Sequence, residues 1–332
     1  MAKPLSSLFA QLRGIALVAP WLGYLLLADA LLSFLLPFKL FFPDAVYNLS
    51  SRIASSVWRW IQYIFETCNG AVVTISGDAL PKEESAVVVA NHVGWSDFYM
   101  IQSLAIRAGM LGRCRWFAKI QLRMVPFLGW GLWAMGFPLV SRNWSKDRAE
   151  LERVFSGITD RRWPTCELSI VQPARPDEKS RTSLTHPTGL ISFSEATRFT
   201  PKKYLESKQW CADNRKPQPQ HLLYPRTKGF VTTVQHLRKA PHVKAVYDMT
   251  IAYQRGRQWQ QAPTMWETLS LPQLSRAQQK GGPGYRFHVY ARRFPLDELP
   301  QDDEGLAAWL EERWVEKGQW LDEKKAEWAD AS

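Results

Sequence analysis

The sequence has few cysteines, and their spacing suits neither a metal site nor a disulfide framework. No two of them form a Cys-x-x-Cys pair, which zinc ribbons require, and the chain is far longer than a disulfide-stapled miniprotein. No metal site is therefore expected. Four reduced thiols are expected instead, at Cys68, Cys114, Cys166 and Cys211.

Internal repeats and low-complexity tracts are also absent from the sequence, which excludes collagen-like, coiled-coil and disordered proteins. The 332 residues are 46% hydrophobic and include 16 Trp and 16 Phe. A chain of this length and composition can bury a substantial core in one large domain or two ordinary ones.

Acidic residues are scarce everywhere except at the C-terminus. The whole chain carries a formal net charge of +11, whereas the residues from 302 onward hold ten acidic and four basic side chains. The main body is therefore strongly positive. Such a field attracts nucleic acid, anionic lipid headgroups or phosphate-bearing small molecules, and charge alone does not choose among them.

A nearly continuous apolar run occupies Gly14 to Phe38, with Asp29 as its only formal charge. Its length matches the roughly 20 residues that a helix needs to cross a bilayer, and no signal-peptide cleavage site follows it. A membrane anchor is expected here, and a buried core helix is the alternative. A second, aromatic-rich segment, Val57 to Phe65, is expected to lie at the membrane interface or to pair with the first.

From residue 71 onward, short β-like runs alternate with amphipathic stretches, a texture typical of an α/β domain. We expect a membrane anchor over 1–68, a catalytic domain over 69–298 with a loop insertion at 167–189, and an acidic C-terminal helix over 299–332. In that helix, Leu306 and Trp314 belong to an aromatic stripe that follows Asp302 as a possible cap. The expected strands are Val72–Ser76, Ala86–Val89, Gly136–Val140, Leu190–Ser194, Val243–Tyr253 and Tyr285–Ala291.

The apolar run 86–90 ends directly in His92, and Asp97 follows five residues later. Ligands of open α/β sheets bind beyond the carboxyl ends of strands, which is where His92 is expected. Residues five apart on one helix lie about 140° apart around its axis, so the two side chains can meet only if the chain turns between them. Gly94 permits that turn, and Ser96 is expected to cap a helix that begins near Asp97. The carboxylate would then orient the imidazole as a general base.

Three other clusters place a basic residue after an apolar run, and each of them alone could be ordinary surface. The first ends at Arg142, the second runs from Glu195 to Arg198, and the third contains Arg226. Arginine offers forked donors that suit a phosphate group.

Together these segments resemble the glycerolipid acyltransferases related to 1-acylglycerol-3-phosphate acyltransferase. The segment Asn91 to Asp97 is similar to their NHxxxxD motif, and Glu195-Ala-Thr-Arg198 to their EGTR motif. Gly136 to Arg142 and Tyr224-Pro-Arg226 resemble two further motifs, in the family's order, and Lys119 matches the segment between the first two. Other stretches are similar to the branch that contains lysocardiolipin and lysophosphatidylinositol acyltransferases.

The resemblance implies a mixed sheet with flanking helices and a reaction in which a lysophospholipid hydroxyl attacks the thioester of acyl-CoA. His92 would be the general base and Asp97 would orient it. Substrate-binding roles carry over to six residues: Glu195, Thr197, Arg198, Arg142, Arg226 and Lys119. Acyl-CoA is then a co-substrate, and no cofactor is implied. The implied location is a membrane, that of the endoplasmic reticulum.

Three features depart from the family's pattern. Ala196 replaces the glycine of the EGTR motif and would be strained if that position needs positive φ. Pro138 lacks a backbone donor, so its strand is expected to lie at a sheet edge or to begin at Leu139. The stretch 167–189 is either an inserted loop or a segment wrongly retained in the gene model.

Two other functions remain open at this level. A nucleic-acid-binding protein would explain the basic charge, although the cations are dispersed and an apolar anchor has no purpose there. A non-catalytic membrane scaffold of the same fold would need none of His92, Asp97, Glu195 and Arg198. The expected partners are therefore acyl-CoA, a lysophospholipid and the bilayer, without nucleic acid. The headgroup, acyl-chain preference, membrane topology and oligomeric state do not follow from the sequence.

Overall fold

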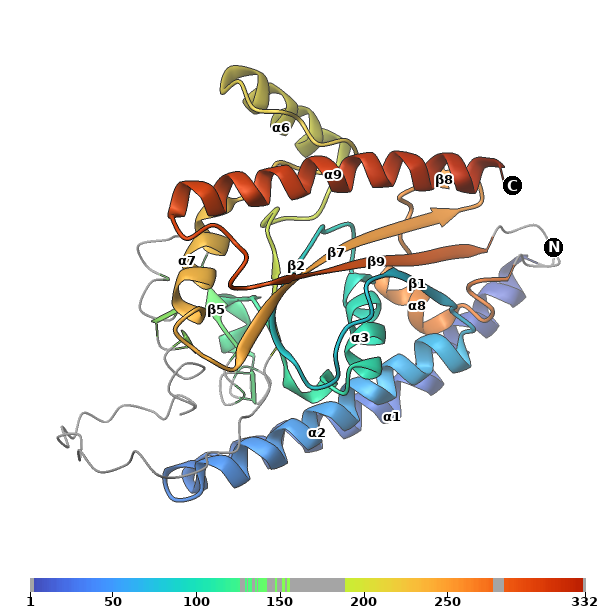
Figure 1. Ribbon diagram of the computed structural model, residues 1–332. Coiled ribbons are helices and arrows are strands. Elements are labelled where there is room, and N and C mark those ends of the chain that lie inside the picture. The colour runs from blue at the N-terminus through green and yellow to red at the C-terminus, as the bar shows by residue number, and fades with distance from the viewer. Residues whose placement is uncertain are drawn as a thin grey trace.

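The computed structural model shows a mixed sheet with helices on both of its faces (Figure 1). This architecture confirms the expected fold class. The model describes residues 3–125, 129, 131–132, 135, 137–141, 147, 151–152, 154–155, 189–276 and 284–330. The loop expected at 167–189 lies outside these residues except for Gly189, where a strand begins.

The main sheet has the strand order β1-β9-β7-β2-β6-β3, and β8 pairs with β7. Strand β2 runs parallel to β7 and β6, whereas β9 runs antiparallel to β7 and parallel to β1. β2 is buried along its whole length, which explains its unbroken apolar sequence. The bounds are β1 Val73–Gly77, β2 Ser85–Ala90, β3 Cys114–Trp116, β6 Gly189–Phe193, β7 Val243–Arg255, β8 Gln258–Trp259 and β9 Tyr285–Pro295.

Five of the six expected strands are confirmed, with both ends within four residues of the expected ones. The sixth, expected over 136–140, is reduced to β5 (Leu139–Val140), which pairs with β4 (Ala118–Lys119) in a separate two-stranded sheet. It begins directly after Pro138, because proline has no N–H to give to a ladder.

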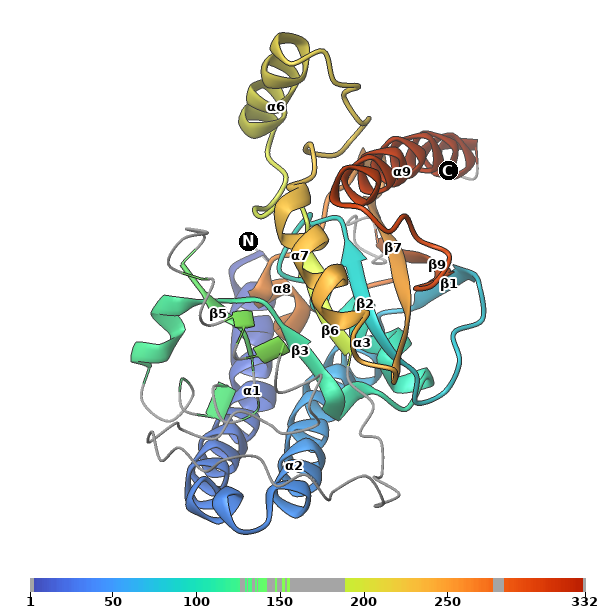
Figure 2. The ribbon, with the colours of Figure 1, turned by 60° about the vertical axis from the view of Figure 1, so that its left-hand side comes forward.

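The two faces of the sheet are covered by different parts of the chain. α3 (Asp97–Arg107) packs on one face, together with α1 (Lys3–Leu35), α2 (Pro43–Tyr63) and α8 (Met265–Ser270). α7 (Thr227–Leu237) and α9 (Asp303–Asp330) cover the other face (Figures 1 and 2). α6 (Pro201–Asp213) projects away from the body of the chain (Figures 1 and 2). Short helical turns complete the fold: Pro37–Leu40, Ile64–Cys68, Leu111–Arg113 and Ile120–Met124.

The N-terminal helices α1 and α2 form a long hairpin along one side of the molecule (Figure 1). Among the described residues, one helix, Leu8–Leu35, is long and apolar enough to cross a membrane, and most of it is exposed. Near its beginning, Arg13 donates to Asn69 Oδ1 and to the carbonyl of Cys68, both at 2.6 Å. This end of α1 is therefore fastened to the main domain.

The second helix is longer than the aromatic segment that suggested it. Its start at Pro43, and not near Val57, corrects the expected beginning. Proline is well suited to the first turn of a helix because the missing N–H has no intrahelical partner there. This half of the helix was not predicted, because residues 44–56 are largely polar. Small side chains such as Ser50 and Ala54 are nevertheless buried in it at helical spacing.

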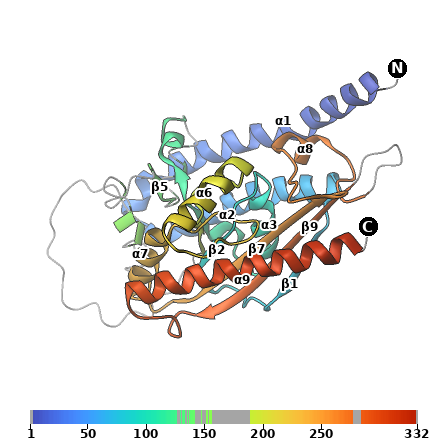
Figure 3. The same ribbon diagram turned by 90° about the horizontal axis from the view of Figure 1, so that it is seen from above.

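The acidic C-terminal helix α9 forms as expected. The Oδ1 atom of Asp302 accepts from the N–H of Gly305 at 2.7 Å and so caps its first turn. Leu306, Leu310 and Trp314 lie on its buried face. Seen from above, α9 and α1 run along opposite sides of the molecule (Figure 3).

Candidate active site

His92 lies just beyond the carboxyl end of β2 and is bonded to Asp97. The distance from His92 Nδ1 to Asp97 Oδ2 is 2.7 Å. The chain turns at residues 93–96, and Asp97 then begins α3, where a negative charge is favoured by the helix dipole. The contact expected between these two side chains is therefore present.

Asp97 is almost completely buried, and several donors satisfy its carboxylate. Oδ2 also accepts from the backbone N–H groups of Val93 at 2.7 Å and Gly94 at 3.0 Å. The hydroxyl of Tyr253 donates to the other oxygen, Oδ1, at 2.8 Å. A buried carboxylate with four such partners is held in one orientation.

The expected cap by Ser96 is wrong. Its hydroxyl makes no capping hydrogen bond with α3. Its backbone has φ −69° and ψ −9°, which is helical, whereas an N-cap side chain reaches the helix from extended backbone. The turn is held by Asp97, whose carboxylate folds back onto Val93 and Gly94.

Asn91 fastens the end of β2 to β7. Its side-chain amide donates to the carbonyl of Ile251 at 3.0 Å and accepts from the N–H of the same residue at 2.8 Å. This pair of bonds explains why an asparagine directly precedes His92. It fixes the point at which the chain leaves the sheet.

The Glu195–Arg198 turn lies directly against His92. β2 and β6 are parallel, with Ala90 opposite Phe193, so both strands end at the same edge. The ring of Phe193 stacks on the imidazole of His92, with centroids 4.1 Å apart and planes inclined by 17°. The N–H of Phe199 donates to the carbonyl of His92 at 2.8 Å. Two segments about 100 residues apart thus form one wall.

Glu195 points inward from this turn and is only 3% exposed. Neither carboxylate oxygen makes a hydrogen bond of ordinary geometry with the described residues, although the backbone of His92 and the indole of Trp314 lie near the carboxyl group. Burial raises the pKa of Glu195 well above its usual range, which favours the neutral acid. A buried carboxyl group without partners costs stability unless a ligand or water satisfies it, so Glu195 is suited to meet a ligand.

Ala196 adopts a left-handed backbone with φ of 58°, as its place in the motif required. For an L-residue with a Cβ, this backbone region costs about 1–2 kcal/mol, whereas glycine adopts it without that cost. The substitution Ala196→Gly is therefore expected to raise the free energy of unfolding by about 1 kcal/mol, after the greater freedom of glycine in the unfolded chain is subtracted.

Urea unfolding followed by tryptophan fluorescence measures this change. Ala326→Gly is the matched control, because Ala326 is exposed inside α9 and its replacement should destabilise by about 1 kcal/mol. A loss of stability in Ala196→Gly as large as that of the control would contradict the strain argument.

A cavity of about 640 Å³ adjoins Glu195. Thr197 and Arg226 also line it, and the N–H of Arg226 donates to the carbonyl of Ser194 at 2.7 Å. This bond ties the third basic cluster to the Glu195 turn. The remaining wall comes from α6, the segment 223–228 and Glu311 of α9. The cavity thus gathers carboxyl, hydroxyl and guanidinium groups, whereas His92 and Asp97 do not line it.

The other predicted binding residues lie elsewhere. Arg198 is exposed and does not line this cavity, although it belongs to the same turn. Lys119 is exposed at the end of β4 and does not line it either. Arg142 lies outside the described residues. The structure therefore joins Glu195, Thr197 and Arg226 in one cavity and leaves Arg198 and Lys119 outside it.

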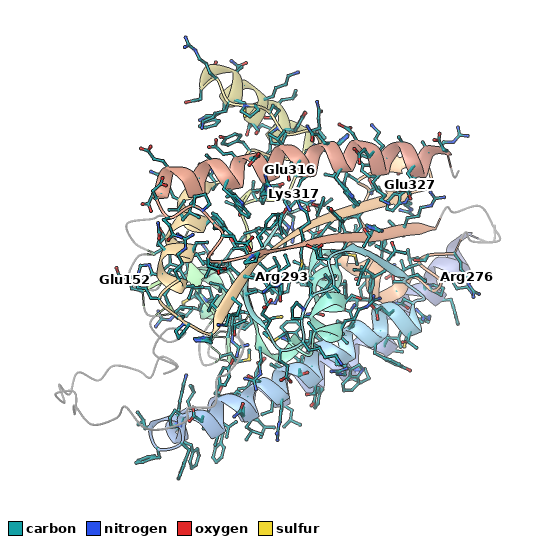
Figure 4. The ribbon with its side chains drawn as sticks, in the orientation of Figure 1. Glu152, Arg276, Arg293, Glu316, Lys317 and Glu327 are labelled. Carbon is teal, nitrogen blue, oxygen red and sulfur yellow. The ribbon has the colours of Figure 1, made fainter. Side chains whose placement is uncertain are left out.

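Sequence reasoning gave no role to three residues around this site. Tyr253 was recognised only as the end of a strand, and the burial of its hydroxyl beside Asp97 had no sequence signal. Lys203 of α6 donates to Thr197 Oγ1 at 2.5 Å. The only sequence indication of this contact was that Lys203 follows the motif closely. Lys317 of α9 lies between that helix and the sheet (Figure 4).

Comparison with known proteins gives two family matches along the chain. The model of the family described as "Acyltransferase" matches residues 72–254, and that described as "Acyltransferase C-terminus" matches 280–327. The first match contains every residue of the site apart from those on α9.

Curated relatives resemble most of the chain. It is 27% identical over 279 residues to 1-acyl-sn-glycerol-3-phosphate acyltransferase 2 of Arabidopsis thaliana, covering 83% of this chain and 62% of that protein. It is 30% identical over 280 residues to 1-acyl-sn-glycerol-3-phosphate acyltransferase delta of Mus musculus, covering 83% and 64%. The chain thus spans less than two thirds of these relatives' length.

One solved structure also resembles the chain. It is the crystal structure of the 1-acyl-sn-glycerophosphate (LPA) acyltransferase PlsC from Thermotoga maritima, at 15% identity and a TM-score of 0.45. The match covers 90% of this chain and 95% of that one.

Proposed function

The chain belongs to the acyltransferase family, whose model matches more than half of its length, and from this membership we propose that it transfers a fatty acyl group from acyl-CoA to the free hydroxyl of a lysophospholipid. The substrate is of the lysophosphatidic acid or lysophosphatidylinositol type. The first of these agrees with the names of the relatives, which are 1-acyl-sn-glycerol-3-phosphate acyltransferases.

The observation that carries the proposal is the His92–Asp97 pair. Because Nδ1 of His92 is bonded to Asp97, the other ring nitrogen, Nε2, is the one that can take a proton. In the proposed step it takes the proton of the lysophospholipid hydroxyl while the oxygen attacks the thioester carbonyl carbon. The carbon–sulfur bond then breaks, and the proton passes from His92 to the leaving CoA thiolate. An ester forms, and no acyl-enzyme is required.

Asp97 contributes to this step by fixing and stabilising the imidazolium. Its carboxylate is buried and held by backbone donors, so it need not reorganise when His92 becomes charged. A hydroxyl substrate that is placed correctly needs no protein nucleophile.

The cavity beside Glu195 is proposed to hold the polar part of the substrate. Arg226 would bind a phosphate oxygen through its forked donors, and Glu195 and Thr197 would meet hydroxyl groups. Arg198 is proposed to reach the same anion from its exposed position on the turn, while Arg142 and Lys119 remain proposed binding residues on the evidence of their motifs alone. The positive main body would favour both anionic substrates.

We also propose a membrane location, in the endoplasmic reticulum, with residues 1–68 as the anchor. The exposed apolar surface of α1 supports this, since side chains such as Leu26 and Phe34 are more than half exposed. A lysophospholipid resides in or on a bilayer, so an anchored enzyme meets its acceptor there.

A substrate panel tests the proposed function. Purified protein in detergent micelles is given labelled oleoyl-CoA with lysophosphatidic acid, lysophosphatidylinositol or lysocardiolipin, and the labelled lipids are separated by thin-layer chromatography. Labelled phospholipid with one of these acceptors supports the proposal, and the best acceptor names the substrate. No labelled product with any of them overturns it.

Arg226→Ala tests the proposed phosphate contact. Loss of a charge-assisted hydrogen bond of about 1.5–3 kcal/mol should raise KM for the preferred lysophospholipid roughly tenfold to a hundredfold, with a smaller change in kcat. Arg257→Ala is the control, because Arg257 is an exposed arginine in the turn between β7 and β8. Equal KM values in the two variants would remove Arg226 from the binding site.

A further inference from the structure

Tyr253 occupies an unusual place beside the His92–Asp97 pair. It lies near the end of β7, far from the His92 segment in sequence, and its side chain is completely buried. Its hydroxyl donates to Asp97 Oδ1 at 2.8 Å, while Oδ2 of the same carboxylate bonds His92. The two oxygens of Asp97 therefore have different partners. Oδ2 bonds the imidazole of His92, and Oδ1 accepts from the hydroxyl of Tyr253.

We propose that Tyr253 is a positioning residue for the proposed general base, which acts on His92 through Asp97. The inference deepens the proposed function and rests on it. Without the phenolic hydroxyl, the carboxylate would keep its bonds to His92, Val93 and Gly94, all at Oδ2, and could rotate about that anchor. With it, both oxygens are fixed.

Strand β7 holds the pair through two residues. The backbone of Ile251 accepts one hydrogen bond from the Asn91 side chain and donates another to it, and the hydroxyl of Tyr253, two positions later, donates to Asp97. Strand β7 is therefore bonded to the residue just before His92 and to the carboxylate that follows it. This is a more specific arrangement than the general filling of a core by an aromatic ring.

The ionisable groups around Asp97 agree with this role. Burial and the nearby charge of Asp97 raise the pKa of Tyr253 well above its usual range, so its hydroxyl keeps the proton that it donates. Glu195 faces Asp97 from the β6 turn, and burial raises its pKa, which favours its uncharged form. Lys317 of α9 lies beyond Glu195 and is paired with Asp248. Tyr253 and His92 are thus the side chains bonded to the Asp97 carboxylate.

Tyr253→Phe removes the hydroxyl and keeps the ring. Hydrogen bonding stabilises the charged form of a carboxylate, so its loss should make the His92–Asp97 pair bind a proton more tightly. The pH midpoint at which His92 becomes reactive should therefore rise by about one unit. A merely structural role would lower stability and leave this midpoint in place.

The midpoint is measured without substrate. Detergent-solubilised protein is treated with diethyl pyrocarbonate over a range of pH, and modification of the peptide containing His92 is followed by mass spectrometry. The matched control is Tyr99→Phe, because Tyr99 is equally buried but its hydroxyl lies near Thr268 Oγ1, at 3.4 Å. This control should leave the midpoint unchanged. In parallel, kcat/KM for acyl transfer should fall roughly tenfold in Tyr253→Phe only.

A second variant covers the case in which Tyr253→Phe does not fold. Incorporation of 3-fluorotyrosine at position 253 keeps the hydroxyl and makes it a stronger donor, so the midpoint should move to lower pH. A midpoint that coincides with that of the unmodified protein in the variants that fold overturns the inference. Absence of acyl transfer in the unmodified protein would overturn the proposed function instead, and the modification midpoints would still decide the role of Tyr253.

Discussion

Replacement of His92 by alanine is expected to lower acyl transfer by about 10³-fold while the protein remains folded. The imidazole is the group placed to take the hydroxyl proton, and its partner Asp97 lies too deep in the protein to replace it. The side chain of His92 is about one fifth exposed and stacks on a single ring, so its removal leaves the core intact. The measurement is the initial rate with labelled acyl-CoA and the preferred lysophospholipid.

A second histidine provides the control for this experiment. His221 also pairs with an aspartate, Asp322, at 2.7 Å, but it joins the loop before α7 to α9 and does not follow β2. His221→Ala should retain activity close to that of the unmodified protein. Retained activity in His92→Ala would remove His92 as the proposed base and would require another group to take the hydroxyl proton.

The second large effect concerns stability, and it comes from a buried charge on α9. Lys317 is fully buried, donates to the carbonyl of Met249 at 2.7 Å and pairs with the buried carboxylate of Asp248. Burial lowers the pKa of Lys317, and the charge of Asp248 opposes this shift. Lys317→Ala would leave Asp248 buried with Arg292 as its remaining described ion-pair partner. The expected loss is about 3–5 kcal/mol in the free energy of unfolding.

Urea unfolding of the detergent-solubilised protein measures this loss. Lys324→Ala on the same helix is the control, because Lys324 pairs with the exposed Glu327 and should contribute less than about 1 kcal/mol. The double variant Lys317→Met with Asp248→Asn should recover part of the stability, since it removes both charges. Equal stability of Lys317→Ala and Lys324→Ala would show that the buried pair does not hold α9 on the sheet.

Local sequence patterns predicted much of this architecture. Short β-like runs predicted β1, β2, β6, β7 and β9. The apolar run of β2 is unbroken because this strand is buried along its whole length. The contact of His92 with Asp97 was also predictable, since it depends on six consecutive residues and one turn. Strain at Ala196 was expected only if the glycine position of the motif needs positive φ, and the structure meets this condition.

Other features depended on contacts between distant segments. The start of α2 at Pro43 was missed because the helix buries small polar residues, which have no clear apolar period. Ser96 does not cap α3, because the carboxylate of Asp97 accepts the backbone hydrogen bond that holds this turn. No pattern indicated that Glu195 would be buried without partners, or that Lys317 would be buried at all.

The sequence by itself determined the family, the order of the strands along the chain and the residues of the His92–Asp97 pair that we propose as base and carboxylate. Tertiary structure decided the order of the strands in space, with β7 between β9 and β2, and so brought Tyr253 to Asp97. It also selected Arg226, and not Lys119, for the cavity beside Glu195. The physical reason is that hydrogen bonds and burial act between neighbours in space, whereas a sequence pattern reports only on neighbours along the chain.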